Sequence, residues 1–444
     1  MRFLWFEVQG YKNLRAPLRL TDIGRINVLH GDNNVGKSNL LEAIGLFFVL
    51  VRIFREEAGG GPSLAERYAL RTPPAAMEAD GTATHTTVRS LGYFAEHGFP
   101  ANEIFNFKGK RPIEIRARLQ FEAFDVDETD PGWFTLPFEV GFQLERRDQD
   151  LRLAHTQLVR ADGADVTPSL GDTQRALDRI GGRQRDGMTY PRFALIRTDR
   201  TIASAFTPTA EAPGGREPLP RELGLAIYDA EESKDPRFTR LLTSLEAFRD
   251  LVGEGQWRAH YNRHADRADL RFNGEPLRLM GSGVQQIVNL AARLLLTGAD
   301  IIAIEEPELN LRYSAQLHLR DVLNGLVGEG DGPSQLLLTS HSPAFELAPT
   351  FYALTRGAEG PHVKPRPSAD ARDFTTPEMQ MPPAGARAPL SYVTTDGLVQ
   401  VPEDVRKALH LEHGGGVYFV PEEDDQHYRM LTNAQFWDLF EPRE

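Results

Sequence analysis

The segment that most constrains the fold of this chain is the octapeptide GDNNVGKS, residues 31–38. It follows a short apolar run, Ile26 to Leu29, and leads into residues 39–44, whose apolar side chains recur with helical spacing. In such a strand, loop and helix unit, the glycines let successive backbone N–H groups face one anion, and the helix start adds partial positive charge. Lys37 and Ser38 can then reach the outer phosphates and Mg²⁺ of a nucleotide. The segment therefore predicts a nucleotide site; the alternative is a glycine turn before an ordinary helix.

Composition sets limits on the rest of the chain. Its 444 residues allow two or three domains, and 41% hydrophobic with 25% charged residues is typical of soluble globular proteins. The absence of cysteine excludes disulfides and cysteine-ligated zinc. No apolar run approaches the roughly eighteen residues of a membrane span, and residues 1–8 have the pattern of a strand. We therefore expect a cytoplasmic protein without membrane contact, and a net charge of −13 disfavours indiscriminate nucleic-acid binding.

A second chemically distinctive segment is DIIAIEEPE, residues 300–308, an apolar strand run that ends in adjacent carboxylates. Beside a phosphate-binding loop, Glu305 could hold a metal through water and Glu306 could polarise an attacking water. The alternative is a strand followed by an acidic turn.

Two further segments fall at places where elements should begin or end. Ser282, between two glycines, precedes the helical stretch Ile287 to Leu296, so it is either an anion site or a helix cap. His341 follows the apolar strand run Gln335 to Thr339, where it could sense a terminal phosphate or be a bystander. The ordered set of four segments favours the functional interpretation.

Together these segments resemble the ATP-binding-cassette (ABC) ATPases of the RecF, SMC and OLD type, the soluble heads that act on DNA or in phage defence. The similar segments are, in chain order, residues 6–14 (first strand and aromatic-Lys-Asn turn), 31–38 (Walker A), 281–286 (a variant signature motif), 301–306 (Walker B), 307–311 (the segment after it) and His341 (the switch histidine). The resemblance implies an α/β fold: an ABC-type P-loop ATPase head with a mixed sheet and flanking helices.

The resemblance also implies roles for single residues, with ATP and Mg²⁺ as cofactors. The implied catalytic residues are Glu306, Lys37 and His341, and the implied Mg²⁺ ligands are Ser38 and Glu305. The implied nucleotide-binding residues are Gly31, Asn33, Asn34, Gly36, Lys37, Ser38, Asn39, Ser282 and Gly283. In such heads the signature serine of one protomer contacts the γ-phosphate held by the other, so ATP becomes part of a homo-oligomeric interface that hydrolysis releases.

This chain departs from the general cassette pattern in two ways. Glu305 stands where Walker B commonly has Asp, which we expect to be tolerated because either carboxylate can hold a metal through water. The signature lacks the usual double glycine. This departure bears on the efficiency of hydrolysis and not on nucleotide binding. For the family's glutamine loop, Gln120 and Gln143 on strand-like segments are the candidates.

The middle of the chain carries no sustained heptads and is broken by glycine- and proline-rich turns, which excludes long coiled-coil arms. Strand patterns cover residues 113–121, 138–144 and 193–200, the last ending in arginines. We expect an inserted helical lid or partner region at about 55–110 and 205–268, within a head spanning 1–363. Residues 216–265 are predicted to be mostly helical, with an apolar stripe of Leu241, Leu242, Leu245 and Phe248 that either forms a partner surface or packs on the head's own core.

Two weaker patterns lie near the end of this region. His260 and His264 would share one helix face at metal-ligand spacing, but no convincing third ligand accompanies them. Arg258, Arg263, Arg267 and Arg271 could meet a nucleic-acid backbone, although acidic residues interrupt them and an ordinary solvated face is the stronger interpretation.

The C-terminal part differs from the head. Residues 364–389 have linker composition, and residues 390–444 resemble the AbrB/MazE swapped-hairpin domain in their order of strand (392–401), helix (403–409), glycine turn and strand (417–420). That family usually dimerises. With eleven acidic residues against four Lys or Arg from Ser391 to Glu444, dimerisation or partner docking is favoured over DNA binding. A β-rich tail packed on the head is the alternative, and the acidic run 422–425 is expected to be a solvated turn, since no nuclease motif accompanies it.

The resemblance implies an ATPase that uses ATP-dependent protomer association to gate a separate effector, a nuclease or toxin, in bacterial anti-phage defence. One alternative is a DNA-repair or recombination ATPase that acts directly on DNA. A second is a regulatory scaffold with a mainly structural ATP site.

Overall fold

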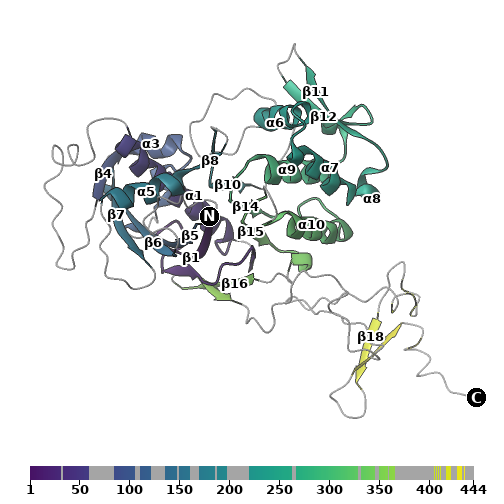
Figure 1. The fold of residues 1–444 in the computed structure, drawn as a ribbon. Coiled ribbons are helices and arrows are strands. Elements are labelled where there is room, and N and C mark those ends of the chain that lie inside the picture. The colour runs from purple at the N-terminus through teal and green to yellow at the C-terminus, as the bar shows by residue number, and fades with distance from the viewer. Residues whose placement is uncertain are drawn as a thin grey trace, which may run out of the picture. The chain divides into compact units, whose positions relative to one another are not determined.

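The computed structural model describes residues 1–31, 34–59, 85–105, 111–121, 136–147, 150–160, 170–185, 188–197, 220–262, 267–328, 332–345, 350–358 and 360–365, with 405, 407, 409, 411, 417–421, 428–432 and 435 near the C-terminus. The chain divides into two compact units, Met1–Phe374 and Thr375–Glu444 (Figure 1). The division falls within the expected linker.

The first unit contains a central, mostly parallel sheet. Its strand order is β10 (Phe193–Ile196), β14 (Ile301–Glu305), β15 (Gln335–Ser340), β3 (Ile26–Gly31), β16 (Thr350–Gly357) and β17 (Gly360–Pro365). The first five strands pair in parallel and β17 is antiparallel to β16. Because side chains of a strand alternate between faces, Ile301 and Ala303 pack into one apolar core and Ile302 and Ile304 into another. A parallel sheet with apolar residues on both faces needs cover on both sides.

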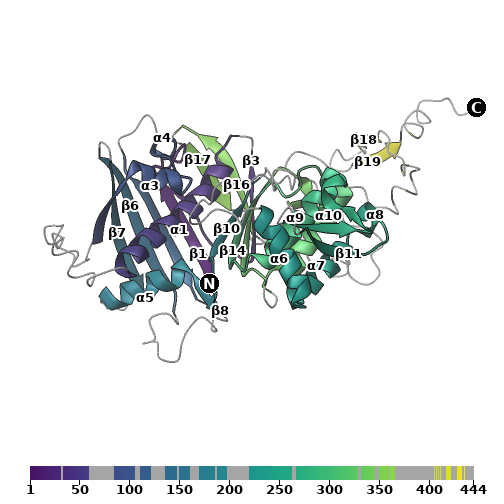
Figure 2. The ribbon, with the colours of Figure 1, turned by 90° about the horizontal axis from the view of Figure 1, so that it is seen from above.

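One face is covered by α1 (Lys37–Gly59) and by a second, antiparallel sheet, as Figure 2 shows. The order of this sheet is β2 (Leu18–Leu20), β1 (Arg2–Gln9), β5 (Ile113–Gln120), β6 (Phe138–Arg147), β7 (Asp150–Arg160) and β4 (His85–Ser90). The first strand and the strands expected at 113–121 and 138–144 are thus confirmed. Shorter elements on this side are α3 (Leu91–Glu96), α4 (Ala101–Ile104), α5 (Leu170–Gly181), β8 (Arg183–Arg185) and β9 (Met188–Tyr190).

The other face is covered by helices. These are α6 (Pro220–Glu232), α7 (Pro236–Glu246), α9 (Ser282–Leu296) and α10 (Tyr313–Leu326), with the short α8 (Arg249–Val252) beyond α7. Leu241, Leu245 and Phe248 are buried in the same core as Ile302 and Ile304. The apolar stripe therefore packs on the head's own core, the second of its two interpretations.

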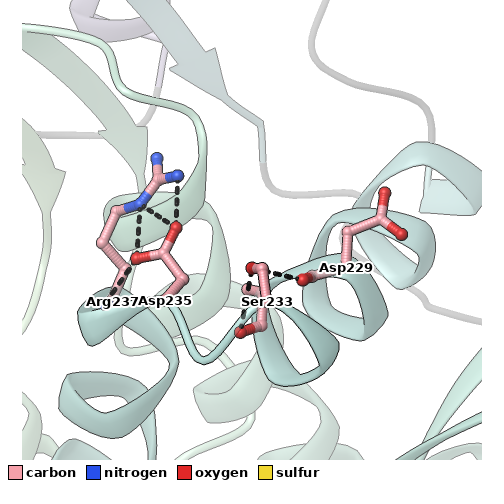
Figure 3. Close-up of polar contacts among 5 residues, drawn as sticks. Asp229, Ser233, Asp235 and Arg237 are labelled. Atoms are coloured by element: carbon pink, nitrogen blue, oxygen red, sulfur yellow. Dashed lines mark hydrogen bonds and ion pairs between the residues drawn. The ribbon is translucent and has the colours of Figure 1, made fainter. Parts of the chain in front are cut away.

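A capped turn separates α6 from α7 (Figure 3). The Ser233 hydroxyl donates to the carbonyl oxygen of Asp229 at 2.6 Å, and Lys234 adopts a left-handed φ of 56°. Asp235 then caps α7 by accepting from the backbone N–H of Arg237 at 2.8 Å, while the Arg237 guanidinium donates to both carboxylate oxygens. With Pro236 at the first helical position, these residues stop one helix and start the next.

The prediction of helix up to residue 265 is wrong at its C-terminal end. Trp257–Asn262 form strand β11, which pairs with β12 (Arg267–Phe272), and β12 pairs with β13 (Glu275–Pro276). Apolar and polar residues alternate from Trp257 to Asn262, which is the period of a strand and not of a helix. His260 therefore does not lie on a helix face, and the spacing argument for a metal pair with His264 fails; His264 itself is outside the described residues, as is Arg263 of the basic stretch.

In the second unit, β18 (Val417–Pro421) and β19 (Tyr428–Thr432) form an antiparallel hairpin. The strand expected at 417–420 is confirmed, whereas the strand expected at 392–401 and the acidic run 422–425 lie outside the described residues. Across the described part of the chain, no helix combines the length and apolar character needed to cross a membrane.

Candidate functional site

The central sheet brings the chemically distinctive segments to one edge. Strands β3, β15 and β14 are neighbours and run parallel, with His30 in register with Ser340 and Thr339 in register with Glu305. Their carboxyl ends therefore meet, and residues that follow them project from the same edge. In open α/β sheets this edge is where ligands bind.

The loop after β3 requires its glycines. Gly31 has a φ of +151°, and a Cβ there would lie 2.4 Å from the carbonyl oxygen of Leu354. Gly36 has a φ of +114°, and a Cβ there would lie 2.9 Å from both amide heteroatoms of Asn13. Asn34 is also left-handed, with a φ of 62°. A backbone of this shape can present its N–H groups to one anion. Asp32 and Asn33 lie outside the described residues.

Asn13 supports this loop from the aromatic-Lys-Asn turn. Its side-chain amide donates to the carbonyl oxygen of Val35 at 3.3 Å and accepts from Asn39 at 2.8 Å. The loop and the first turn of α1 are thus held by one side chain. The resemblance marked this turn without giving it a role, and the expected nucleotide ligand Asn39 is engaged with Asn13.

Glu42, one turn further along α1, is a second support that sequence reasoning missed. It accepts from the Tyr11 hydroxyl at 3.1 Å and from Arg197 at 2.9 Å, and it binds Lys12. Burial first, and then the Glu42 carboxylate, raises the pKa of Tyr11 well above its ordinary value. Arg197 directly follows β10, so the arginine expected at that strand end contacts the loop helix.

Lys37, His341 and Glu306 converge at the centre of the edge. The Lys37 side chain is 6% exposed, and its Nζ donates to the carbonyl oxygen of Gly31 at 2.6 Å and lies 2.9 Å from Nε2 of His341. That nitrogen lies 3.7 Å from Oε1 of Glu306. Burial lowers the pKa of His341, Lys37 lowers it further, and Glu306 opposes both effects. Because an ammonium group only donates, Nε2 of a neutral His341 accepts from Lys37.

The two adjacent carboxylates differ in their surroundings. Glu305, the last residue of β14, is 8% exposed. Glu306 is 33% exposed and has a φ of 42°, and its backbone N–H donates to the carbonyl oxygen of Thr339 at 2.9 Å. Left-handed backbone is uncommon outside glycine and concentrates at functional sites. The turn directs Glu306 out of the strand and toward His341.

The signature segment lies at the start of α9, as predicted, and is exposed at Ser282. The signature segment packs against the segment after Walker B. A Cβ at Gly283 would lie 3.2 Å from the carbonyl oxygen of Asn310, and the side-chain amide of Gln286 donates to the carbonyl oxygen of Pro307 at 3.0 Å. Because Ser282 itself is exposed, its hydroxyl can be reached from solvent. Gln120 and Gln143 lie in the antiparallel sheet, where Gln120 accepts from Arg2 and Gln143 contacts Glu114.

The residues at this edge fit a nucleotide with Mg²⁺. The loop admits no Cβ at Gly31 and Gly36, Lys37 is held across it, and the first turn of α1 carries no acidic residue that would repel phosphate. Ser38, exposed in that turn, and the buried Glu305 offer hydroxyl and carboxylate oxygens, the ligand type that Mg²⁺ prefers.

Fold and site together define a P-loop ATPase head. A family model described as "AAA domain, putative AbiEii toxin, Type IV TA system" matches residues 26–348. Because this is more than half of the chain, the protein belongs to that family. Membership implies nucleotide binding and ATPase activity in general. A search of curated proteins gave no match.

Several solved structures are similar to this chain. The SmcHead bound to the C-winged helix domain of ScpA has 13% identity and a TM-score of 0.48, covering 82% of this chain and 98% of that one. The SMC head domain from Thermotoga maritima has 13% identity and a TM-score of 0.41, with coverages of 83% and 100%. The Smc head domain with an extended coiled coil, bound to the C-terminal domain of ScpA derived from Pyrococcus furiosus, has 11% identity and a TM-score of 0.47, with coverages of 83% and 97%.

Proposed function

We propose that this chain hydrolyses ATP at the Lys37–His341–Glu306 edge and uses ATP-dependent association of protomers to gate a separate effector in anti-phage defence. The observation that carries the proposal is the convergence of these three side chains, within 2.9 and 3.7 Å, at the carboxyl ends of three neighbouring strands. A structural phosphate-binding loop would not need a carboxylate and an imidazole facing its lysine.

In this proposal each residue of the edge has one task. The loop backbone and Lys37 hold the β- and γ-phosphates, and Glu306 polarises the attacking water. His341, kept neutral by its lowered pKa, accepts from Lys37 and reports the γ-phosphate. Ser38 and Glu305 would hold Mg²⁺, which when bound would neutralise phosphate charge. Because Glu306 and His341 are each about one-third exposed, part of the site still faces solvent in a single protomer.

A second protomer would complete the site through its signature segment. Ser282 is exposed at the start of α9, and so are Leu279 (71%), three residues before it, and Leu309 (37%) and Tyr313 (41%), which flank the residues that Gly283 approaches. Exposed large apolar side chains on the segments that flank an exposed polar motif favour a protein interface. We therefore place Ser282 opposite the phosphate loop of the partner subunit, in a dimer or higher homo-oligomer.

The role in defence draws on the family's own description, which names a toxin of a type IV toxin–antitoxin system. The acidic C-terminal part supports docking or dimerisation over direct DNA binding, and its β18–β19 hairpin leaves Phe419 57% exposed. Within the described residues β18 pairs with β19 alone, and a two-stranded hairpin is marginal in water, which favours pairing with further strands, in line with a swapped-hairpin module. The effector, a nuclease or toxin, would be a separate protein in the same cytoplasmic compartment.

Mass in solution and ATP turnover test the proposal together. Wild type and Glu306→Gln are measured with and without ATP, Mg²⁺ and duplex DNA. We expect Glu306→Gln to form an ATP-stabilised assembly larger than the apo protein, and wild type to return to the apo mass as ATP is consumed. A mass that is constant in every condition, with no turnover, would overturn the proposal and leave the scaffold alternative.

The effect of added duplex DNA on ATP turnover distinguishes the proposed effector-gating ATPase from the alternative, a DNA-repair ATPase. Turnover that rises with duplex DNA indicates an ATPase that acts directly on DNA. Turnover indifferent to DNA supports gating of a protein effector.

A further inference from the structure

Glu308 links the segment after Walker B to the strand end that carries His341. Its Oε1 accepts from the Ser340 hydroxyl at 2.8 Å and from the backbone N–H of His341 at 2.9 Å. Ser340 is fully buried. One carboxylate oxygen therefore restrains Ser340, the last residue of β15, and His341, which follows it, through hydrogen bonds strengthened by its charge.

The second oxygen of this carboxylate indicates that Glu308 serves the site and is more than a structural contact. Oε2 of Glu308 is buried and, within the described residues, accepts no hydrogen bond. Burying a carboxylate with an unpartnered oxygen costs free energy, and a neutral acceptor would serve a purely structural turn at lower cost. An unpartnered buried polar atom in a native structure calls for an explanation, and a role at the neighbouring ATP site would explain this one.

The linked residues continue into α10 and back to the Walker B turn. Ser340 Oγ accepts from the N–H of Ser342, Ser342 donates to Gln316 at 2.5 Å, and Gln316 donates to the carbonyl oxygen of Leu311 at 2.8 Å. On the other side, the N–H of Glu306 donates to Thr339. The segment from Glu306 to Leu311 is thus tied to the end of β15 on both sides of His341.

We propose that Glu308 is a positioning residue: it fixes the backbone of His341 so that the imidazole faces Lys37 and Glu306, and it couples the imidazole to the segment against which the signature helix packs. That coupling follows from the contacts of Gly283 with Asn310 and of Gln286 with Pro307. A partner subunit that binds at the start of α9 and displaces the segment after Walker B would then also change the position of the His341 imidazole. The coupling rests on the proposed function, whereas the positioning does not.

The first test needs neither ATP nor Mg²⁺. The protein is labelled with ¹⁵N-histidine, and the resonances of His341 among the 12 histidines are assigned with His341→Gln. We expect Glu308→Ala to shift or broaden the His341 imidazole resonances and Glu308→Gln, which keeps an acceptor oxygen, to leave them near their wild-type positions. Glu254→Ala, at a glutamate that is 86% exposed, is the matched control. Unchanged His341 resonances in Glu308→Ala would overturn the inference.

A second test uses turnover and separates positioning from general damage. Misplacing a reacting group by about 1 Å can cost 10²-fold, so we expect Glu308→Ala to lower kcat about 10- to 100-fold with little change in the KM for ATP. Glu308→Gln should recover most of kcat. Ser340→Ala should lower kcat by less, and the double variant should be no worse than Glu308→Ala, since both changes remove one link.

The outcomes distinguish two failures. If wild type does not hydrolyse ATP, the proposed function fails while the histidine spectra still decide the role of Glu308. If wild type turns over ATP and Glu308→Ala does so equally well, only the positioning inference fails. Weakened ATP binding in both Glu308 variants, with a lowered melting temperature, would show a structural brace and would also overturn it.

Discussion

The Nζ atom of Lys37 lies 2.9 Å from Nε2 of His341, although the two residues are 304 positions apart in the chain. Lys37 opens α1 after β3, and His341 follows β15, the neighbouring parallel strand. The sheet therefore assembles the site, because strands that are adjacent and parallel bring their carboxyl ends together. In the proposed function each side chain has a different task at this edge, so we expect single substitutions to have separable effects.

Lys37→Ala and Glu306→Gln should separate binding from hydrolysis. Lys37 lies across the loop, so its loss should weaken ATP binding itself. Glu306→Gln keeps the loop intact, and the loss of one group aimed at the transition state typically lowers the rate about 10²- to 10³-fold. We expect this variant to retain ATP. A filter assay for retained nucleotide measures both, and equal loss of bound ATP in the two variants would contradict the assignment.

The stability of the protein should depend on pH through His341. Its folded pKa lies below the ordinary histidine value of 6.5, mainly because of burial and next because of Lys37. Between these two pKa values the unfolded chain binds the proton and the folded chain does not. The contribution of neutral His341 is thus fully present above pH 6.5 and is lost as the pH falls toward the folded pKa.

This dependence is measured as the melting temperature of the nucleotide-free protein across that pH range. His341→Gln should flatten the loss of stability on acidification. His260→Gln is the control, since His260 is exposed on β11 and lies outside the site. An unchanged slope in His341→Gln would contradict the prediction.

Much of the site could be predicted from the sequence because it lies at junctions with strong local patterns. Gly31 to Ser38, Glu305 and His341 each follow an apolar strand run, and Ser282 begins a helix as expected. The prediction was wrong at β11 because the helical pattern of the preceding stripe was extended over Trp257 to Asn262, where apolar and polar residues alternate. That alternation was present in the sequence and would have corrected the prediction.

The supports of the site could not be predicted in the same way. Glu42 contacts Arg197, and Glu308 contacts Ser340, across separations of 155 and 32 positions. Which side chains meet across such separations depends on strand register and helix placement, and tertiary packing sets both. An acidic residue on α1 or in a turn carries no pattern of its own that reveals its partner.

Two glycines offer a matched test of the loop. Gly36→Ala places a Cβ at a φ of +114°, 2.9 Å from the Asn13 amide that also holds Val35 and Asn39. Strained backbone of this kind costs about 1–3 kcal/mol, and displacement of Asn13 should also weaken ATP binding.

Gly325→Ala is the control for that change. Gly325 lies in α10 with open space around it, and alanine in a helix is favoured over glycine by about 0.5–1 kcal/mol. We expect a lowered melting temperature for Gly36→Ala and an equal or raised one for Gly325→Ala. If both variants melted like wild type, the strained loop geometry would be wrong.

A buried ion pair at the opposite end of β14 should dominate stability without entering the chemistry. Arg192 and Asp300 are each 3% exposed and form a salt bridge. Asp300→Asn removes the carboxylate that pairs with Arg192 and with the N-terminal ammonium of Met1, and breaking a buried pair typically costs about 3–5 kcal/mol. Glu254→Ala breaks a pair with Arg249 whose side chains are 86% and 63% exposed, and such pairs contribute at most about 1 kcal/mol. Denaturant unfolding followed by tryptophan fluorescence compares the two variants, and equal effects would contradict the burial of the first pair.

Mixing two inactive variants tests whether Ser282 acts on the partner's nucleotide. Lys37→Ala disables the loop, and Ser282→Arg places a bulky charge on the exposed signature segment, so each variant alone should be inactive. In a two-fold dimer, a mixed pair contains one site in which the intact loop of one subunit faces the intact signature of the other. Random pairing of equal amounts should therefore restore about one quarter of wild-type turnover, since half of the dimers are mixed and each has one good site. Activity that stays at the level of the separate variants would indicate that Ser282 and Lys37 serve one protomer, and the site would then be complete within a single chain.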